Sequence, residues 1–159
     1  MNASINGKKL LKNLAIPLVG GTAAGLLTKN GVQIFNETAR KPAFMPPGWL
    51  FPVAWTILYA LMGVAAYQID DAPGTPEQKR ALLIYYVQLA MNLLWSFLFF
   101  GGRFYLAALV WLVALLALIV ATIVKFWKIK PKSGALLLPY AAWVTFAGVL
   151  NAAVWMLNR

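Results

Sequence analysis

Apolar residues along this chain gather into five runs of about 20 residues, separated by short polar or proline-rich segments. A helix of that length crosses the hydrocarbon core of a bilayer. The runs are apolar throughout, unlike the alternating strands of a membrane barrel, and a backbone in lipid must pair its own polar groups. The pattern therefore predicts an all-α membrane protein, a bundle of five transmembrane helices in a single domain over residues 1–159, with helices at 10–27, 47–69, 81–100, 104–124 and 133–157.

A proline-rich stretch leads directly into the second apolar run. Proline lacks a backbone N–H and biases the preceding residue toward extended backbone. The stretch contains three prolines, Pro42, Pro46 and Pro47. We expect a stiff loop here, with Pro47 in the first helical turn, where a missing N–H costs nothing. Pro52 is expected to kink or tighten that turn. Trp55 and Tyr59 follow four residues apart, so they share one helix face.

The first run has two interpretations. Lys8, Lys9 and Lys12 precede it, and the small residues at 20–25 loosely resemble a signal-peptide cleavage region. Alternatively the helix is retained, and Gly21 and Gly25 form a face of small residues that lets another helix pack closely. We expect the retained helix, because a cleaved segment would leave these glycines without a role.

Composition agrees with a membrane location, and the charge pattern suggests an orientation. Hydrophobic residues make up 62% of the chain and charged residues 11%, against roughly 25% charged in soluble domains. The net charge is +10, but the basic residues flank helices and form no single patch, so we expect anionic lipids and no nucleic acid as partners. Lys and Arg divide nine to five between the two ends of the predicted bundle. The positive-inside rule then predicts a cytoplasmic N-terminus. We expect the membrane to be a bacterial cell membrane.

The chain contains no His and no Cys. This excludes the usual zinc sites, disulfides, cysteine nucleophiles, His-dependent triads and haem held by His or Cys. We predict no metal site and no cofactor. The four acidic residues are expected in loops, which disfavours proton-coupled transport by a carboxylate at membrane depth; they are Glu37, Asp70, Asp71 and Glu77.

Polar residues inside the predicted helices are few, and three of them repeat at intervals of four: Gln88, Asn92 and Ser96. Such a stripe serves either to hydrogen-bond neighbouring helices or to place a few polar groups in a ligand cavity with aromatic walls. The residues alone leave both open. Three tryptophans lie too deep for an interfacial belt and are candidates for that cavity: Trp55, Trp95 and Trp143.

Several segments together resemble one known family. These are KPAFMPP at 41–47, WTILYALMG at 55–63, QLAMNLLWS at 88–96 with FFG at 99–101, PYAAW at 139–143 and VLNAAVW at 149–155. In content and order they are similar to the hallmarks of the tryptophan-rich sensory protein/translocator protein (TspO/MBR) family. The resemblance covers essentially the whole chain.

The resemblance implies a compact five-helix bundle, usually a homodimer, whose first interhelical loop folds over a pocket for porphyrins and other hydrophobic ligands. The ligand-binding residues carried over by motif are Trp55, Tyr59, Asn92, Trp95, Ser96, Trp143 and Ala147. The lid residues are Asn36, Pro42, Phe44, Pro46 and Pro47. Three positions depart from the family pattern: Phe35-Asn36 replaces Trp-Tyr, and Phe44 replaces Trp. The lid is therefore less aromatic. The cholesterol motif of the animal proteins is absent, so sterol binding is unsupported.

Three functions fit the resemblance. The first is a receptor or sensor that binds porphyrins and regulates the tetrapyrrole level. The second is a carrier that transports porphyrin or lipid between compartments. The third is an enzyme that degrades porphyrin with light and oxygen, and Trp55 and Trp143 would then be its catalytic residues. The receptor is the first expectation, and the carrier and the enzyme are its alternatives. Aromatic stacking can bind a flat macrocycle without a metal ligand, which is compatible with all three functions and does not distinguish them.

Overall fold

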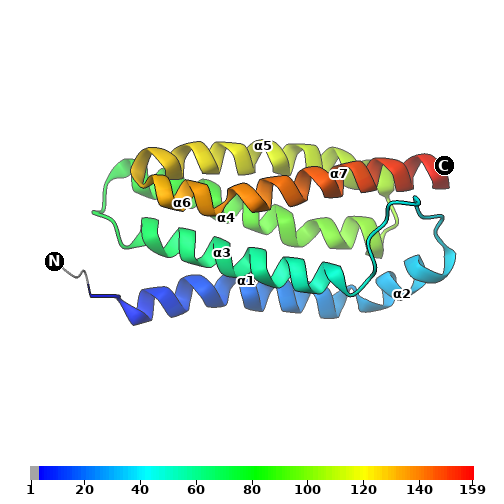
Figure 1. Cartoon of the computed structure of the whole chain (residues 1–159), viewed down its shortest axis with the longest axis horizontal. Helices are drawn as coiled ribbons and strands as arrows, with labels where there is room; N and C mark the ends of the chain where they lie inside the picture. Colours follow the sequence, from blue (N-terminus) through cyan, green and yellow to red (C-terminus); the bar gives the residue numbers. More distant parts are fainter. Residues whose placement is uncertain (1–3) are drawn as a thin grey trace.

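The computed structural model describes residues 4–159, and these form a bundle of long helices lying roughly along one axis (Figure 1). Five segments are long and apolar enough to cross a membrane, and no strand occurs within the described range. The predicted all-α membrane bundle is therefore confirmed. The elements are α1 (Gly7–Leu27), α2 (Lys29–Thr38), α3 (Leu50–Asp70), α4 (Pro76–Ser96), a π-helical turn η1 (Phe97–Gly101), α5 (Tyr105–Ile129), α6 (Pro131–Leu136) and α7 (Leu138–Asn158).

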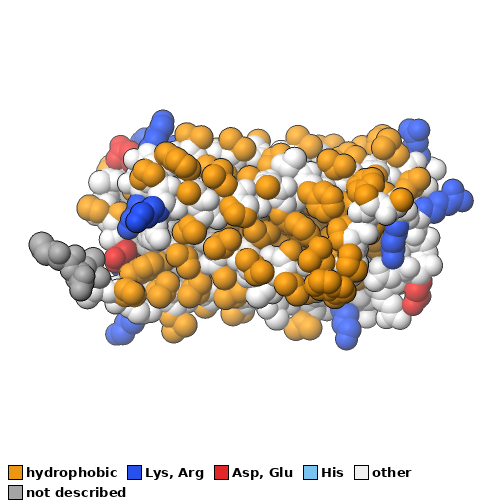
Figure 2. Space-filling model, viewed as in Figure 1, with side chains coloured by type: hydrophobic (Ala, Val, Ile, Leu, Met, Phe, Trp, Pro, Cys, Tyr) orange, Lys and Arg blue, Asp and Glu red, His pale blue; other side chains and the backbone are white. Residues whose placement is uncertain are grey.

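The long helices pack in pairs that do not simply follow chain order. α1 packs on α3, while α5 packs on both α4 and α7. The two ends of the chain lie at opposite ends of the bundle in Figure 1. In Figure 2 orange apolar side chains cover the middle of the visible face, and blue and red charged groups lie near the two ends. A broad apolar band between charged ends is the surface that a bilayer requires.

The main buried core lies among α3, α4, α5 and α7. A second, smaller cluster lies at the end of the bundle near the loop after α2. It includes Phe35 from α2, Phe99 from η1 and Val154 from α7, each at most 5% exposed. The candidate site described below lies where these two cores approach each other, because Trp95 packs against both.

The predicted start of the second transmembrane helix is three residues early. α3 begins at Leu50, so Pro47 lies before the helix, although its carbonyl accepts a hydrogen bond from Leu50 N at 3.0 Å. Pro52 then occupies the third helical position. The first four N–H groups of a helix have no partner within it, so proline is tolerated there. The expectation that Pro47 lies in the first helical turn is therefore wrong, because the helix begins three residues later.

The other helix boundaries differ because apolar runs mark the hydrocarbon core and not the helix ends. α1 begins at Gly7 and α4 at Pro76, before the apolar residues that predicted them. In α4 the start is set by capping chemistry: Thr75 Oγ1 accepts from Gln78 N at 3.2 Å, and Pro76 stands at the first helical position. α5 continues to Ile129. The last predicted helix is divided at Leu137 into α6 and α7.

The sequence pattern missed α2. This ten-residue helix contains Lys29 and Glu37 and is too polar and too short to span a bilayer. It follows α1 directly and crosses η1 at a close approach, because a Cβ atom at Gly31 would lie only 2.5 Å from Phe100 O. Only glycine fits at that contact.

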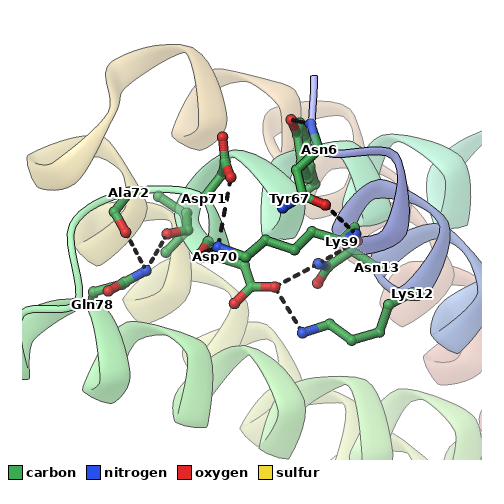
Figure 3. Close-up of polar contacts among 10 residues, drawn as sticks. Asn6, Lys9, Lys12, Asn13, Tyr67, Asp70, Asp71, Ala72 and Gln78 are labelled. Atoms are coloured by element: carbon green, nitrogen blue, oxygen red, sulfur yellow. Dashed lines mark hydrogen bonds and ion pairs between the residues drawn. The ribbon is translucent and has the colours of Figure 1, made fainter. Parts of the chain in front are cut away.

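Figure 3 shows a polar cluster that joins the start of α1 to the end of α3. Lys12 Nζ lies 2.7 Å from Asp70 Oδ2, which also accepts from Asn13 Nδ2 at 3.0 Å. Lys9 Nζ donates to Asp70 O at 3.0 Å. The prediction that all acidic residues lie in loops is wrong: Asp70 ends α3, Glu77 lies in the first turn of α4, and Glu37 lies in α2. Of these three, only Asp70 is paired with a lysine within residues 4–159, and Glu37 accepts from Gln33 Nε2 at 3.1 Å.

Gly21 and Gly25, expected on one packing face, have different surroundings. A Cβ atom at Gly21 would lie 2.2 Å from Tyr59 Cε2. Around Gly25 nothing lies within 4 Å of such an atom. Close packing of α1 on α3 therefore depends on Gly21, which lies directly against Tyr59.

Candidate functional site

A small internal cavity of about 10 Å³ lies between α3, α4, α5 and α7. Its walls are Trp55, Asn92, Trp95, Leu112, Leu115, Val144 and Ala147. Four of the seven ligand-binding residues named from the sequence are among them, one from α3, two from α4 and one from α7: Trp55, Asn92, Trp95 and Ala147. A volume near 10 Å³ corresponds to about one water molecule, so these side chains close the cavity almost completely.

Tyr59 lies beside the cavity and does not line it. Its ring stacks on Trp55 with centroids 5.4 Å apart and planes inclined by 26°. Its hydroxyl donates to Asn92 Oδ1 at 2.8 Å. Because Trp55 and Tyr59 are one turn apart on α3, they form a continuous aromatic surface that is pinned to α4 through Asn92.

A chain of hydrogen bonds continues from Asn92 across the bundle. Asn92 Nδ2 donates to the hydroxyl of Tyr140 on α7 at 2.7 Å, and that hydroxyl donates to Gln88 Oε1 at 2.7 Å. All three residues are at most 4% exposed. Of the two interpretations of the polar stripe, helix-to-helix hydrogen bonding is therefore present, and Asn92 also lines the cavity.

Some buried polar atoms in this region have no partner among the described residues. They include Gln88 Nε2, Trp143 Nε1 and the hydroxyl of Tyr85. The first two are N–H donors. A buried donor without an acceptor costs roughly 1–3 kcal/mol. Neither Gln88 nor Trp143 lines the cavity, although each belongs to a helix that contributes to its wall.

Ser96 and Trp143, also named from the sequence, lie outside the cavity wall. Ser96 is the last residue of α4. Trp143 lies edge-on to Phe51 in the first turn of α3, with centroids 5.9 Å apart, and tilts against Phe146 at 5.7 Å. Trp143 therefore packs near the beginning of α3, on the side where the loop enters.

The loop over residues 39–49 contains four of the five lid residues named from the sequence. It makes a turn in which Met45 N donates to Pro42 O at 3.1 Å. The side-chain amide of Asn158 at the end of α7 holds the loop: its Nδ2 donates to Arg40 O and its Oδ1 accepts from Arg40 N, both at 2.8 Å. Phe44 is 52% exposed.

Asn36, the fifth lid residue, lies in α2 and not in the loop. Its Oδ1 accepts from Lys41 Nζ at 3.0 Å. The same ammonium lies 5.5 Å from the centre of the Phe35 ring. The assignment of Asn36 to an irregular loop was wrong because the helical, amphipathic character of residues 29–38 was not recognised.

Trp95 connects the cavity to the aromatic cluster under the loop. Its ring stacks on Phe99 with centroids 4.9 Å apart. Its Nε1 donates to Asn151 Oδ1 at 3.2 Å, and Asn151 Nδ2 donates to Tyr105 O at 2.7 Å. Met45 of the loop packs against the same cluster. Movement of the loop would thus act on a residue of the cavity wall.

The π-helical turn η1 directly follows Trp95 and Ser96. Gly102 N donates to Phe97 O at 2.8 Å, the five-residue spacing of a π-helix. Such turns are rare and frequently mark functional sites. Here the turn presents Phe99 to Trp95, whose ring it stacks on, and Phe100 to α2.

Sequence reasoning missed three of the wall residues, Leu112, Leu115 and Val144, as well as the supporting Asn151 and Tyr140. Leucine and valine in a transmembrane helix give no signal that separates a cavity wall from a lipid contact. Tyr140 and Asn151 stand within segments that carry the family resemblance, so they were detectable in principle. Among residues 4–159 no group of three or more His, Cys, Asp or Glu gathers as a metal site would require.

Comparison with known proteins gives a consistent result. A model of the TspO/MBR family matches residues 13–156. Tryptophan-rich protein TspO of Archaeoglobus fulgidus is 40% identical over 154 residues, covering 97% of this chain and 99% of the relative. The tryptophan-rich sensory protein of Cereibacter sphaeroides is 37% identical over 122 residues, covering 77% and 75%. The translocator protein of Bos taurus is 34% identical over 146 residues, covering 91% and 86%.

Proposed function

The chain belongs to the TspO/MBR family, and on that premise we propose that it is a membrane receptor or sensor that binds porphyrins and related hydrophobic ligands between α3, α4, α5 and α7, and thereby regulates the tetrapyrrole level. The observation that carries the proposal is the convergence of Trp55, Trp95 and Asn92 on one internal cavity. Aromatic faces with a few polar groups are the usual composition of a small-molecule site.

A flat macrocycle with acidic side chains suits the chemistry around this cavity. Indole and phenol faces stack on conjugated rings without any metal ligand. The unpartnered donors, Gln88 Nε2 among them, could be satisfied by carboxylate oxygens of the ligand. The name of the Cereibacter sphaeroides relative, a tryptophan-rich sensory protein, supports a sensing role.

Ligand binding requires the site to open. Pockets for drug-sized molecules measure about 300–1,000 Å³, far more than the 10 Å³ cavity. The loop at 39–49, through Met45 and the aromatic cluster, reaches the ring of Trp95. We therefore assign the entrance to the loop, whose movement would enlarge the cavity.

The test is a titration of the full chain in detergent with metal-free protoporphyrin, followed by tryptophan quenching and porphyrin absorbance. Trp55→Ala should weaken binding roughly threefold to tenfold, because one stacked aromatic surface is lost. Trp127→Ala is the control, since Trp127 lies near the end of α5 and is 46% exposed. Equal affinity of wild type and Trp55→Ala would contradict the site.

The same samples separate the receptor from the other two functions. A carrier would move porphyrin across the wall of sealed vesicles that contain the protein. An enzyme would consume porphyrin under illumination. For the receptor we expect saturable binding with neither flux nor consumption. Because the chain offers no His or Cys to ligate haem iron, haem and metal-free protoporphyrin should bind with similar affinity, and a haem preference of a hundredfold would contradict this site chemistry.

A further inference from the structure

A surface groove of about 200 Å³ lies between the beginning of α4 and the end of α5, far from the cavity. It is lined by Glu77, Arg80, Lys125, Lys128 and Ile129. Three cations and one carboxylate leave the groove with an excess of positive charge. None of the three cations lies within 4.0 Å of a carboxylate in the described part of the chain.

The cations come from two facing helices. Glu77 and Arg80 are three residues apart on α4, and Lys125 and Lys128 are three apart on α5, so each pair shares a helix face. α4 and α5 pack against each other in opposite directions. The two pairs therefore oppose each other across the groove, which is an arrangement able to surround one anionic group.

The groove lies at the level of lipid headgroups. About 20 residues of helix cross the hydrocarbon core, and α5 has 25 residues. Lys125 and Lys128 belong to its last two turns, beyond the uninterrupted apolar stretch that ends at Val124. Trp127, in the same turns, is 46% exposed, and tryptophan is enriched at membrane interfaces.

The surface beneath the groove is apolar. Val87 lies two helical turns from Arg80 on the same face of α4 and is 44% exposed. On α5, Ala121 lies four residues before Lys125 and seven before Lys128, and Ala117 lies four residues further along that face. Val87 and Ala117 are exposed and Ala121 is half-buried. They form an apolar strip that continues from the cations along α4 and α5 toward the bilayer centre.

We propose that this groove binds an anionic phospholipid, with its phosphodiester between Arg80, Lys125 and Lys128 and an acyl chain along the apolar strip of α4 and α5. A phosphodiester whose headgroup carries no balancing cation complements the net positive charge of the groove. Free phosphate would use the cations but not the apolar strip. Basic pockets between transmembrane helices are known to hold lipid headgroups in this way. The site is separate from the proposed porphyrin pocket and does not depend on it.

The experiment is native mass spectrometry of the full chain released from detergent micelles. The probes are phosphatidylglycerol and phosphatidylcholine with identical acyl chains, together with glycerophosphoglycerol and inorganic phosphate, which have no acyl chains. We expect one phosphatidylglycerol to be retained at least tenfold more tightly than phosphatidylcholine. The probes without acyl chains should fail to displace it at a hundredfold excess.

Two charge-matched double variants locate the site. Arg80→Gln with Lys128→Gln removes two cations of the groove, both exposed, and should weaken phosphatidylglycerol binding roughly tenfold to thirtyfold. Lys79→Gln with Lys130→Gln removes two exposed cations at the same end of the bundle, outside the groove, and should change binding less than threefold.

Four results would overturn the proposal. Equal retention of both lipids would remove the charge preference, and equal losses in both double variants would indicate diffuse attraction. Displacement by inorganic phosphate would indicate a site for a free anion. If the groove variant altered the oligomeric state and left lipid retention unchanged, the groove would be an interface between copies of the chain.

Discussion

Gly21→Ala is the sharpest test of how α1 supports the candidate site. The added methyl carbon would lie 2.2 Å from Tyr59 Cε2 and 2.6 Å from Cδ2. Carbon atoms pack at about 3.5–4.0 Å, so the ring or the helix must retreat by more than about 1 Å. Tyr59 cannot swing away freely, because it stacks on Trp55 and donates to Asn92.

The expected cost follows from those contacts. Overpacking a well-packed contact costs roughly 1–3 kcal/mol, and loss of the Tyr59 to Asn92 hydrogen bond adds about 1 kcal/mol. Alanine gains up to about 1 kcal/mol over glycine from helix propensity. Gly21→Ala should therefore lower the free energy of unfolding by about 1–3 kcal/mol. Displacement of the aromatic wall at Trp55 should weaken porphyrin binding about tenfold.

Gly25→Ala is the matched control on the same helix. It carries the same gain in propensity, and nothing lies within 4 Å of the added atom. Thermal unfolding of both variants in one detergent, with the oligomeric state measured on the same samples, gives the comparison. If Gly21→Ala were as stable as Gly25→Ala and bound porphyrin like the wild type, the argued contact between α1 and Tyr59 would be wrong.

Three further predictions concern the loop, the ionic cluster and possible photochemistry. Replacing Pro46 and Pro47 with Ala should weaken porphyrin binding severalfold, because a more flexible loop loses more entropy on ordering, while circular dichroism shows unchanged helix content; unchanged affinity would mean that the loop only connects helices. Asp70→Asn should lower the free energy of unfolding, measured by thermal unfolding, by about 1–3 kcal/mol, because it removes the carboxylate that Lys12 Nζ and Asn13 Nδ2 contact at 2.7 and 3.0 Å. Asp71→Asn is the control. Its ion pair is longer, at 3.6 Å, and more exposed, so it should lower that free energy by less than about 1 kcal/mol. Trp55→Phe keeps a stacking surface and removes the oxidisable indole. If the wild type consumes porphyrin under illumination, this variant should still bind porphyrin but consume less of it. Unchanged consumption would exclude Trp55 as the reactive group.

The transmembrane helices could be predicted because a helix that crosses the hydrocarbon core needs an apolar run of matching length. The apolar runs did not predict where the helices begin and end. For example, α4 begins at Pro76, with Thr75 as its N-cap, in a polar segment. α2 escaped detection because it is short and polar and shows no long apolar run. The π-helical turn at 97–101 has no residue signature that distinguishes it from continuing α-helix.

The candidate site was predictable where polar or aromatic residues interrupt an apolar helix. Asn92 and Trp95 stand out in this way, and both line the cavity. Leu112 and Leu115 could not be recognised, because a leucine that faces a cavity and a leucine that faces lipid look alike in a sequence. The position of Trp143, against Phe51 and outside the cavity wall, also depends on how α3 and α7 cross, which the sequence does not encode locally.

The two hydrogen bonds between the Asn158 side chain and the Arg40 backbone have a consequence for how the loop at 39–49 opens. Asn158 is the final residue of α7, and its amide also donates to Val154 O at 2.7 Å. Helix ends unwind locally with opening free energies near zero. When the last turn of α7 frays, both hydrogen bonds to Arg40 break together, and the loop at 39–49 loses its attachment to α7. The proposed entrance is thus attached to the last turn of α7, and we expect its opening to follow fraying of that turn. Amide hydrogen exchange at Arg40 should then keep pace with exchange in the final turn of α7.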